Sequence, residues 1–169
     1  MTTARLALLA AAGSAALLAA AFLFQMLGWQ PCAMCLWQRW PHAAAVVLGL
    51  AAGAAAGIGR GVLAGLGAVS ILTGAGIAAY HSGVERKWWQ GPESCSGSGG
   101  GLGGLSGAEL VPGASDAPAL VLCDSFTPFL LGLSMANWNL IASLVLTVIW
   151  IAALTRAFSS RAAGTSRST

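Results

Sequence analysis

Residues 6–27 decide the class of fold, and they read LALLAAAGSAALLAAAFLFQML, 22 residues without a charge. A helix of this length rises about 33 Å, which is enough to cross a hydrocarbon core of about 30 Å. Three more uncharged stretches follow, at 42–59, 62–80 and 137–154. Because only Arg60 and Gly61 separate the second stretch from the third, we expect these two to form an antiparallel hairpin. The sequence therefore predicts an all-α fold, an integral membrane four-helix bundle in a single domain, 1–169.

The composition supports a membrane protein and excludes other classes. Hydrophobic residues make up 57% of the chain and charged residues 8%, against roughly 45–50% and about 25% in soluble domains. Such a chain is too apolar for a soluble domain or for a disordered protein. The net charge of +3 is small and dispersed, which argues against nucleic acid as a partner.

The distribution of basic residues predicts the orientation. Four spans place both termini on one side of the membrane, and most of the arginines fall on that side: Arg5, Arg60, Arg156, Arg161 and Arg167. The positive-inside rule assigns this side to the cytoplasm, together with the tail 155–169. Loops 28–41 and 81–136 are then extracytoplasmic. A cleaved signal peptide is the alternative for the first span, but that span is longer than the usual apolar region of about 7–15 residues.

All four cysteines lie in the two predicted outer loops, Cys32 and Cys35 in the first, Cys95 and Cys123 in the second. An even number on the oxidising side of a membrane favours disulfide chemistry. Cys95 and Cys123 enclose 27 residues, so a bond between them would be a staple worth about 3–4 kcal/mol. Cys32 and Cys35 enclose only two residues, so their spacing is better explained by reactivity than by stability.

The surroundings of Cys32 and Cys35 favour a thiolate, the nucleophilic form of cysteine. Pro31 precedes the pair, an apolar helix follows it, and Arg39 lies one turn beyond Cys35; a helix N-terminus and a cation both lower a thiol pKa. The sequence has no haem, flavin or nucleotide motif, so we expect a membrane quinone to accept the electrons, with Arg39 binding a quinone carbonyl. Arg39 as an interfacial anchor is the alternative.

Other residues have simpler interpretations at this stage. A zinc site built from the four thiolates is disfavoured because the second pair lacks short ligand spacing, so no metal is expected. We interpret His42 and His81 as polar interface residues, and the tryptophans beside the spans as an aromatic belt. Three further features are assigned to packing or to loop structure: Gly49, Gly53, Gly57, Gly61 and Gly65 to a close-packed hairpin, 97–107 to flexible coil, and 108–122 to a short interfacial segment.

Three stretches resemble the quinone-dependent disulfide bond formation protein B (DsbB) family of bacterial inner membranes. The first is PCAMCLWQRWPH at 31–42, where Arg follows the CxxC at the fourth position. The second is HSGVE at 81–85, followed by the Trp88-Trp89 pair, Gly91-Pro92 and Cys95. The third is Cys123-Asp124 followed by LGLSMANW at 131–138. Met34, where the family often has Leu, and the glycine-rich insert 97–107 depart from the pattern.

The resemblance implies an enzyme that generates disulfides at the expense of membrane quinone, either ubiquinone or menaquinone. Cys95 would form a mixed disulfide with a periplasmic thioredoxin-like oxidase of the DsbA type, Cys123 would exchange with Cys32, and Cys35 would face the quinone beside Arg39. The chain would lie among the lipids of the bacterial inner membrane, with both termini cytoplasmic and the active loops periplasmic. The CxxC pair precedes the loop pair, which favours this family over relatives of vitamin K epoxide reductase.

A small membrane transporter or structural protein with disulfide-tied loops is the alternative from another class. Transport pathways are commonly marked by charges within the membrane, and the four predicted spans hold none.

Overall fold

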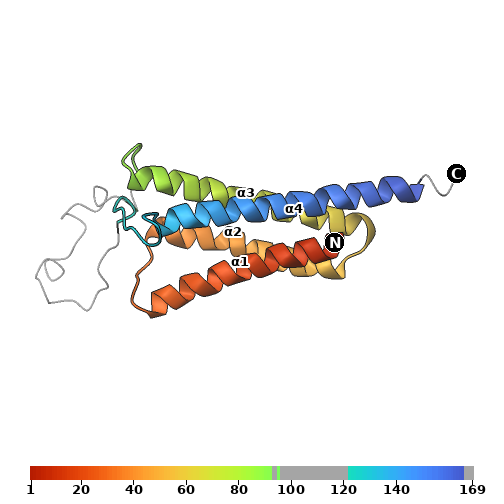
Figure 1. Cartoon of the computed structure of the whole chain (residues 1–169), viewed down its shortest axis with the longest axis horizontal. Helices are drawn as coiled ribbons and strands as arrows, with labels where there is room; N and C mark the ends of the chain where they lie inside the picture. Colours follow the sequence, from red (N-terminus) through yellow and green to blue (C-terminus); the bar gives the residue numbers. More distant parts are fainter. Residues whose placement is uncertain (93–94, 96–121, 166–169) are drawn as a thin grey trace, which may run out of the picture.

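A computed structural model describes residues 1–92, 95 and 122–165, with backbone alone from 161 onward. The described residues form four helices and no extended strand: α1 (Thr3–Met26), α2 (Ala33–Ala54), α3 (Gly57–Glu85) and α4 (Met135–Thr165). The helices lie side by side (Figure 1), with α1 and α3 diagonally opposed and each packed against both α2 and α4. The prediction of an all-α four-helix bundle is confirmed. Both the coil predicted at 97–107 and most of the interfacial segment predicted at 108–122 lie outside the described residues.

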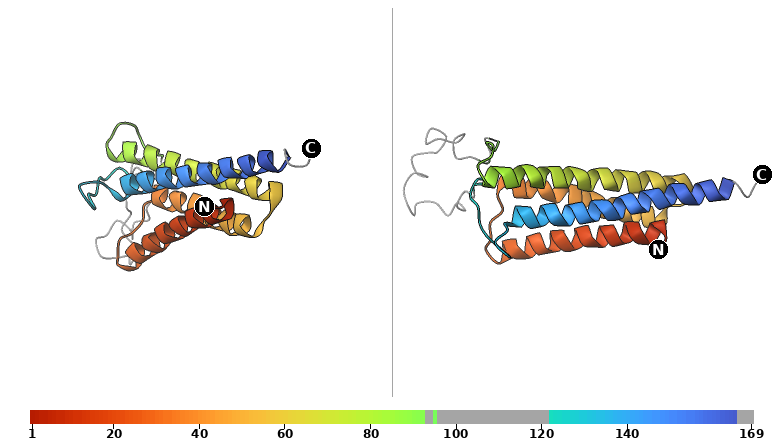
Figure 2. Two further views of the ribbon diagram at one scale, coloured as in Figure 1. Left: turned by 45° about the vertical axis from the view of Figure 1, so that its right-hand side comes forward. Right: turned by 45° about the horizontal axis from the view of Figure 1, so that its top comes forward.

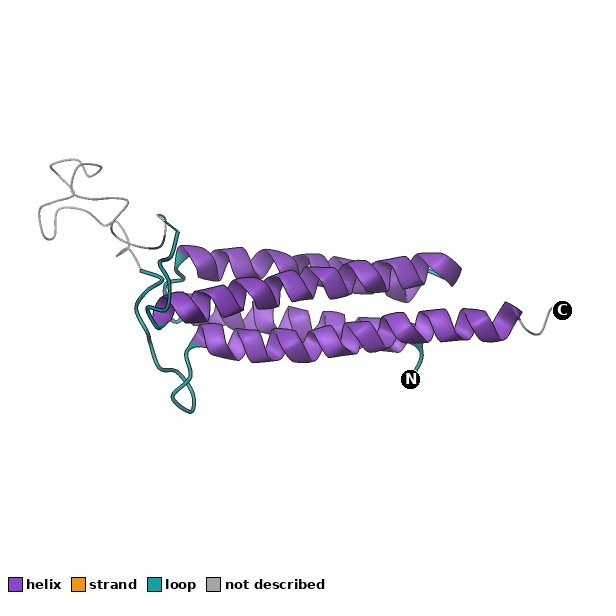
Figure 3. Cartoon of the chain, turned by 90° about the horizontal axis from the view of Figure 1, so that it is seen from above, coloured by secondary structure: helices purple, strands orange, loops and turns teal. Residues whose placement is uncertain are grey.

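Three of these helices are long and apolar enough to cross a membrane, namely Thr3–Met26, Gly57–Glu85 and Met135–Ser160. The described parts of the chain thus form a membrane protein, seen from above in Figure 3. Helix α2 is not apolar enough over a membrane-spanning length, because its first half carries Gln38, Arg39 and His42. The span predicted at 42–59 therefore stays a prediction.

The turn between α2 and α3 lies at residues 55–56, so the prediction that Arg60 and Gly61 separate two helices is wrong. Arg60 belongs to the first turn of α3, and its guanidinium donates to the carbonyl oxygens of Ala52, at 3.2 Å, and Ala55. These carbonyl oxygens lie at the C-terminal end of α2, where they have no hydrogen-bond donor in their own helix, and the Arg60 guanidinium supplies the donors. Gly57 allows the reversal because its φ is +57°, a conformation that costs glycine little.

The helices also extend beyond the predicted spans. Cys35 and Arg39 lie on α2 rather than in a loop, residues 81–85 belong to α3, and α4 continues to Thr165. The predicted boundaries follow the loss of apolar residues, but a helix satisfies its own backbone whether or not lipid surrounds it. Polar side chains at the ends of three helices consequently share one compact region, which contains the cysteines.

Close contacts between helices explain the spacing of the glycines, although the partners differ from those expected. A Cβ on Gly49 would lie 2.8 Å from the Ala7 carbonyl oxygen of α1, and one on Gly53 would meet Leu8. Gly61 and Gly65 face Ala157 and Leu154 of α4. The glycines thus bring the α2–α3 hairpin close to α1 and α4, in the arrangement visible from two directions in Figure 2, rather than packing α2 against α3.

Candidate active site

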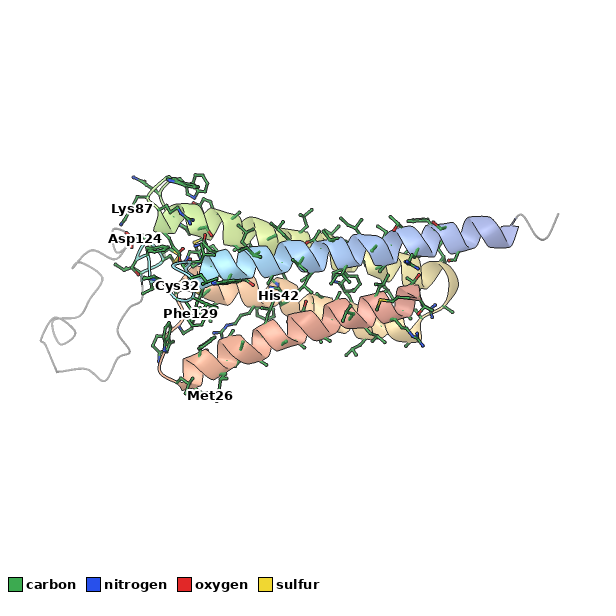
Figure 4. All side chains as sticks on the ribbon, viewed as in Figure 1. Met26, Cys32, His42, Lys87, Asp124 and Phe129 are labelled. Carbon is green, nitrogen blue, oxygen red and sulfur yellow. A yellow bond between two sulfur atoms is a disulfide. The ribbon has the colours of Figure 1, made fainter. Side chains whose placement is uncertain are left out.

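The four cysteines meet at the end of the bundle opposite the chain termini, where Figure 4 labels Cys32. Cys95 and Cys123 form a disulfide, and the Cys123 amide donates to the Cys95 carbonyl at 3.0 Å. Cys32 and Cys35 are free thiols. Cys32, Cys95 and Cys123 share one buried cluster with Met34 and Val84. A disulfide and a dithiol therefore lie beside each other in an apolar setting.

Cys32 is the N-cap of α2, and its Sγ accepts a hydrogen bond from the Cys35 amide at 3.2 Å. The two sulfurs are 2.7 Å apart and share a hydrogen bond. This bond from the Cys32 thiol lowers the pKa of Cys35, and it raises the pKa of Cys32, with burial raising the Cys32 pKa further. Both groups lie before the predicted span at 42–59. The hydrogen bond between the two sulfurs therefore favours a thiolate on Cys35 over a thiolate on Cys32.

His81 lies within the site, so its interpretation as an interface residue is wrong. It is 3% exposed, and its Nε2 lies 3.6 Å from Cys32 Sγ and 4.0 Å from Glu85 Oε1. The continuation of α3 to Glu85 places this side chain beside Cys32 and Cys123. The sequence does contain a signal, since His81 and Glu85 are four residues apart and residues at this spacing share a helix face.

Three of these groups form a cluster of metal-ligand type. The atoms Cys32 Sγ, His81 Nε2 and Cys123 Sγ lie within 4.8 Å of one another. The sulfur of Cys123 is bonded to Cys95, so in this state only Cys32 and His81 of the three can act as zinc ligands. A structural zinc site requires four. The expectation that no metal is bound stays a prediction.

A chain of polar side chains surrounds Glu85 and joins α3 to the start of α4. Ser134 Oγ donates to Glu85 Oε2 at 2.5 Å, and Asn137 Nδ2 donates to Ser134 Oγ at the same distance. Arg86 Nη1 donates to Asn137 Oδ1 at 2.9 Å. Glu85 and Ser134 are both buried, so the Ser134 hydroxyl supplies a hydrogen bond that a buried carboxyl group requires.

Arg39 lies one turn along α2 from Cys35, on the same face of the helix. Its Nη1 donates to Gln25 Oε1 of α1 at 2.8 Å, and its guanidinium carbon lies 4.7 Å from the centre of the Phe22 ring. These contacts fix the guanidinium and leave further N–H groups to bind an oxygen ligand. Both Arg39 and Cys35 are partly exposed. A thiol and a fixed cation are therefore both accessible beside an apolar helix.

Contacts within the second loop, and between it and the first loop, complete the site, and Figure 4 labels several of the side chains. Lys87 Nζ and Asp124 Oδ2 are 2.7 Å apart, and the hydrogen bond from Lys87 lowers the pKa of Asp124. Phe129 packs edge-on against Phe24 and Trp29, with ring centres 5.3 and 5.8 Å away. The first loop is thereby attached to the segment that follows Cys123.

Fold and site together define a membrane-embedded thiol–disulfide oxidoreductase, a helical bundle that holds two cysteine pairs at one end. Residues 3–153 match the family model described as disulfide bond formation protein DsbB, and the chain belongs to this family. It is therefore a membrane protein of disulfide bond formation, as the motifs at 31–42, 81–95 and 123–138 indicate. No curated protein and no solved structure matches the chain.

Proposed function

We propose that the chain reoxidises a DsbA-type periplasmic partner at the expense of a membrane quinone. One observation carries this proposal: the sulfur of Cys123, on the disulfide side, and that of Cys32, on the dithiol side, lie within 4.8 Å of each other. Thiol–disulfide exchange requires this kind of proximity, because a thiolate attacks a disulfide sulfur directly.

The proposed exchange proceeds in two steps. A partner thiolate attacks Cys95, the Cys95–Cys123 bond breaks, and Cys123 leaves with the electron pair. The Cys123 thiolate then attacks Cys32 in a Cys32–Cys35 disulfide, which forms the Cys32–Cys123 bond and leaves the charge on Cys35. Because Cys95 is 1% exposed, the attack by the partner requires the second loop to move.

Electrons leave the protein from Cys35 in this scheme. The hydrogen bond from Cys32 stabilises the Cys35 thiolate, and Arg39 lies beside it with its guanidinium held by Gln25. A quinone bound there would supply the two-electron acceptor. Ubiquinone and menaquinone both present the carbonyl oxygens that Arg39 would bind. We place the protein in the bacterial inner membrane, with the cysteine end of the bundle facing the periplasm.

The test is stopped-flow oxidation of a reduced DsbA-type partner by the purified protein, with ubiquinone or menaquinone added. Cys32→Ser and Cys35→Ser should both abolish quinone reduction. Cys123→Ser leaves Cys95 as a thiol, which should capture the oxidised form of the partner as a stable mixed disulfide, without efficient turnover. Normal turnover by Cys95→Ser would contradict the proposed order of exchange.

A further inference from the structure

A chain of polar side chains, buried except for the half-buried Asn139, runs from the thiols into the bundle. Gln38, on α2, makes three hydrogen bonds in this chain: its Nε2 contacts the Met34 carbonyl oxygen at 3.1 Å and His81 Nδ1 at 2.9 Å, and its Oε1 contacts Asn139 Nδ2 at 2.7 Å. On the far side of Asn139, Oδ1 lies 3.1 Å from His42 Nε2. The chain thus connects α2, α3 and α4.

The Met34 carbonyl fixes the direction of every bond in this chain. A carbonyl oxygen only accepts, so the amide group of Gln38 that faces it is the NH2 group. The same NH2 group faces His81 Nδ1, which must therefore accept, and this leaves the ring proton of neutral His81 on Nε2. The Gln38 oxygen accepts from Asn139, so the Asn139 oxygen accepts in turn from the Nε2 proton of His42.

All of these hydrogen bonds therefore donate toward Cys32. His42 donates to Asn139, Asn139 to Gln38, Gln38 to His81, and His81 Nε2 then presents its proton to Cys32 Sγ at 3.6 Å. Gln38, His42 and His81 are each 5% exposed or less, so water does not compete for these groups. His42 Nδ1 has no hydrogen-bond partner among the described residues, which makes His42 the start of the chain.

We propose that Gln38, Asn139 and His42 are positioning residues that keep the proton of His81 on Nε2, directed at the sulfur of Cys32. Hydrogen bonds that donate in one direction polarise one another, and a bond to an ionised acceptor is stronger than a neutral one. These hydrogen bonds thus stabilise negative charge during the time that it rests on Cys32, before it passes to Cys35. The consequence for exchange rests on the proposed function.

The step that benefits is the one that restores the loop disulfide. When the Cys95 thiolate attacks Cys123 in a Cys32–Cys123 disulfide, the Cys95–Cys123 bond forms and the Cys32–Cys123 bond breaks. The electron pair leaves on Cys32, and the product is the state seen in the structure, a loop disulfide beside two free thiols. The Nε2 proton of His81 stabilises this leaving thiolate. The charge then passes to Cys35 through the hydrogen bond between the two sulfurs.

Other polar groups around His81 leave the tautomer unchanged. The backbone of Cys123 also hydrogen-bonds the His81 ring, and a carbonyl oxygen can accept only the ring proton, which is on Nε2 because Nδ1 faces the NH2 group of Gln38. Glu85 Oε1 is 4.0 Å from Nε2, farther than Cys32, and the other oxygen of this carboxylate is held by Ser134. Neither group faces Nδ1 in a contact that would require a proton there. A proton on Nδ1 would instead point at the NH2 group of Gln38, donor against donor.

The proposal is tested by nitrogen NMR of the full-length protein, labelled with ¹⁵N-histidine, in lipid nanodiscs. A pH of about 8 is used because neutral histidine predominates above its usual pKa. The ring nitrogen that bears hydrogen is identified by its chemical shift. We expect the wild type to carry the His81 proton on Nε2. Gln38→Met, which removes the donor to Nδ1, and Asn139→Leu, which frees the Gln38 amide, should each give a mixture of the two tautomers.

Ser70→Ala serves as the matched control. It removes the hydrogen bond from Ser70 Oγ of α3 to the Pro41 carbonyl oxygen of α2 and leaves the hydrogen bonds from His42 to His81 in place. It should leave the His81 tautomer unchanged. Circular dichroism and formation of the Cys95–Cys123 disulfide show whether each variant folds. A wild type with the proton on Nδ1, or folded Gln38→Met and Asn139→Leu proteins with the wild-type tautomer, would overturn the proposal.

A kinetic measurement tests the consequence. The Cys32–Cys123 disulfide is followed by acid quench and alkylation during turnover with the partner. Asn139→Leu should slow its decay about fivefold, the factor that one ordinary hydrogen bond supplies. An unchanged decay with a shifted tautomer would overturn the role in exchange. Failure of the proposed function is recognised separately, because a wild type without quinone turnover still reports the tautomer of His81.

Discussion

Arg39 is held from the side of α1 by Gln25 and Phe22. A side chain that positions a ligand needs such a restraint, whereas one that anchors a helix at a membrane surface does not. A planar guanidinium offers a rigid pair of donors to a quinone oxygen, whereas lysine is a mobile point charge. We expect Arg39→Lys to raise the apparent KM for quinone. Arg39→Ala should also lower kcat by about 10²-fold, the low end for losing one donor to a developing oxyanion.

Quinone titrations of the two variants at equal protein and detergent concentrations make this measurement. Arg60→Lys, at the opposite end of the bundle, is the control and should keep the wild-type constants. Unchanged KM and kcat in both Arg39 variants would assign Arg39 to the membrane interface.

The hydrogen bond between Cys32 and Cys35 predicts how their reactivity depends on pH. In a Cys95→Ala/Cys123→Ala background, Cys32→Ala removes the donor that lowers the pKa of Cys35, so this pKa should rise. Cys32→Ser keeps an O–H donor, and the rise should be smaller. The rate of alkylation of Cys35 by iodoacetamide, followed against pH, gives the pKa of each variant. Equal midpoints in the three proteins would show that Cys32 does not stabilise the thiolate.

Lys87 and Asp124 give the loop contact its own pH dependence. The hydrogen bond from Lys87 holds the Asp124 pKa below its ordinary value of 3.8. A lowered carboxyl pKa contributes stability above the unfolded value, and the contribution is lost as the pH falls through the folded value. The difference in thermal stability between wild type and Lys87→Met should therefore be constant near neutral pH and shrink below about pH 4. Lys87→Arg should behave as wild type, and a difference that persists at low pH would contradict the ion pair.

At the level of single residues, the sequence was sufficient for the cysteines and insufficient for their surroundings. Cys32, Cys35 and Arg39 could be singled out because a short spacing and a helix start are local features. The place of His81 depends on α3 continuing past the apolar stretch, and that of Asn139 on contact between helices about a hundred residues apart in the chain. The four-residue spacing of His81 and Glu85 marks a shared helix face, but the contact of His81 with Cys32 and that of Asn139 with Gln38 leave no pattern in one sequence.

At the scale of elements, replacing glycine by alanine should have opposite effects on stability at two positions. Gly49→Ala would place a methyl group against the Ala7 carbonyl of α1, and such overpacking typically costs about 1–3 kcal/mol. Gly76→Ala is the matched control, because no atom lies within 4 Å of its Cβ position and alanine favours helix by up to about 1 kcal/mol. Unfolding in detergent should show Gly49→Ala less stable than wild type and Gly76→Ala as stable or more so. Equal stability of the two variants would contradict the close approach of α1 and α2.

The helices could be predicted from apolar runs, whereas their ends could not. The loss of apolar residues marked the limits of the predicted spans, and at Arg60 that limit was a charge, yet Arg60 lies inside α3 because its side chain reaches back to the end of α2. The same limit separated residues 81–85 from the helix to which they belong. A long arginine stem can lie along an apolar surface while its head finds a polar partner, so charge is a weak marker of a helix end.

At the scale of the whole molecule, the bundle separates its chemistry from its termini. The cysteines lie at one end, where Figure 4 labels Cys32, and Arg156 Nη1 donates to the Met1 carbonyl oxygen at 2.9 Å near the other. The loop disulfide spans a sequence separation of 28 and joins the segment after α3 to the segment before α4. Every covalent path from α4 to the other helices therefore passes either through residues 96–122 or through Cys123.

A protein cut between Cys95 and Cys123, at a protease site introduced within 97–107, would consist of two fragments joined by disulfide alone. On a non-reducing denaturing gel the cut wild type should run as one species throughout turnover, because Cys123 passes from Cys95 to Cys32. In cut Cys32→Ser, the fragment carrying α4 should be released when the partner attacks Cys95. Release from the cut wild type during turnover would contradict exchange between Cys123 and Cys32. In such a protein, the covalent link between α4 and the other three helices would last only while Cys123 is in a disulfide.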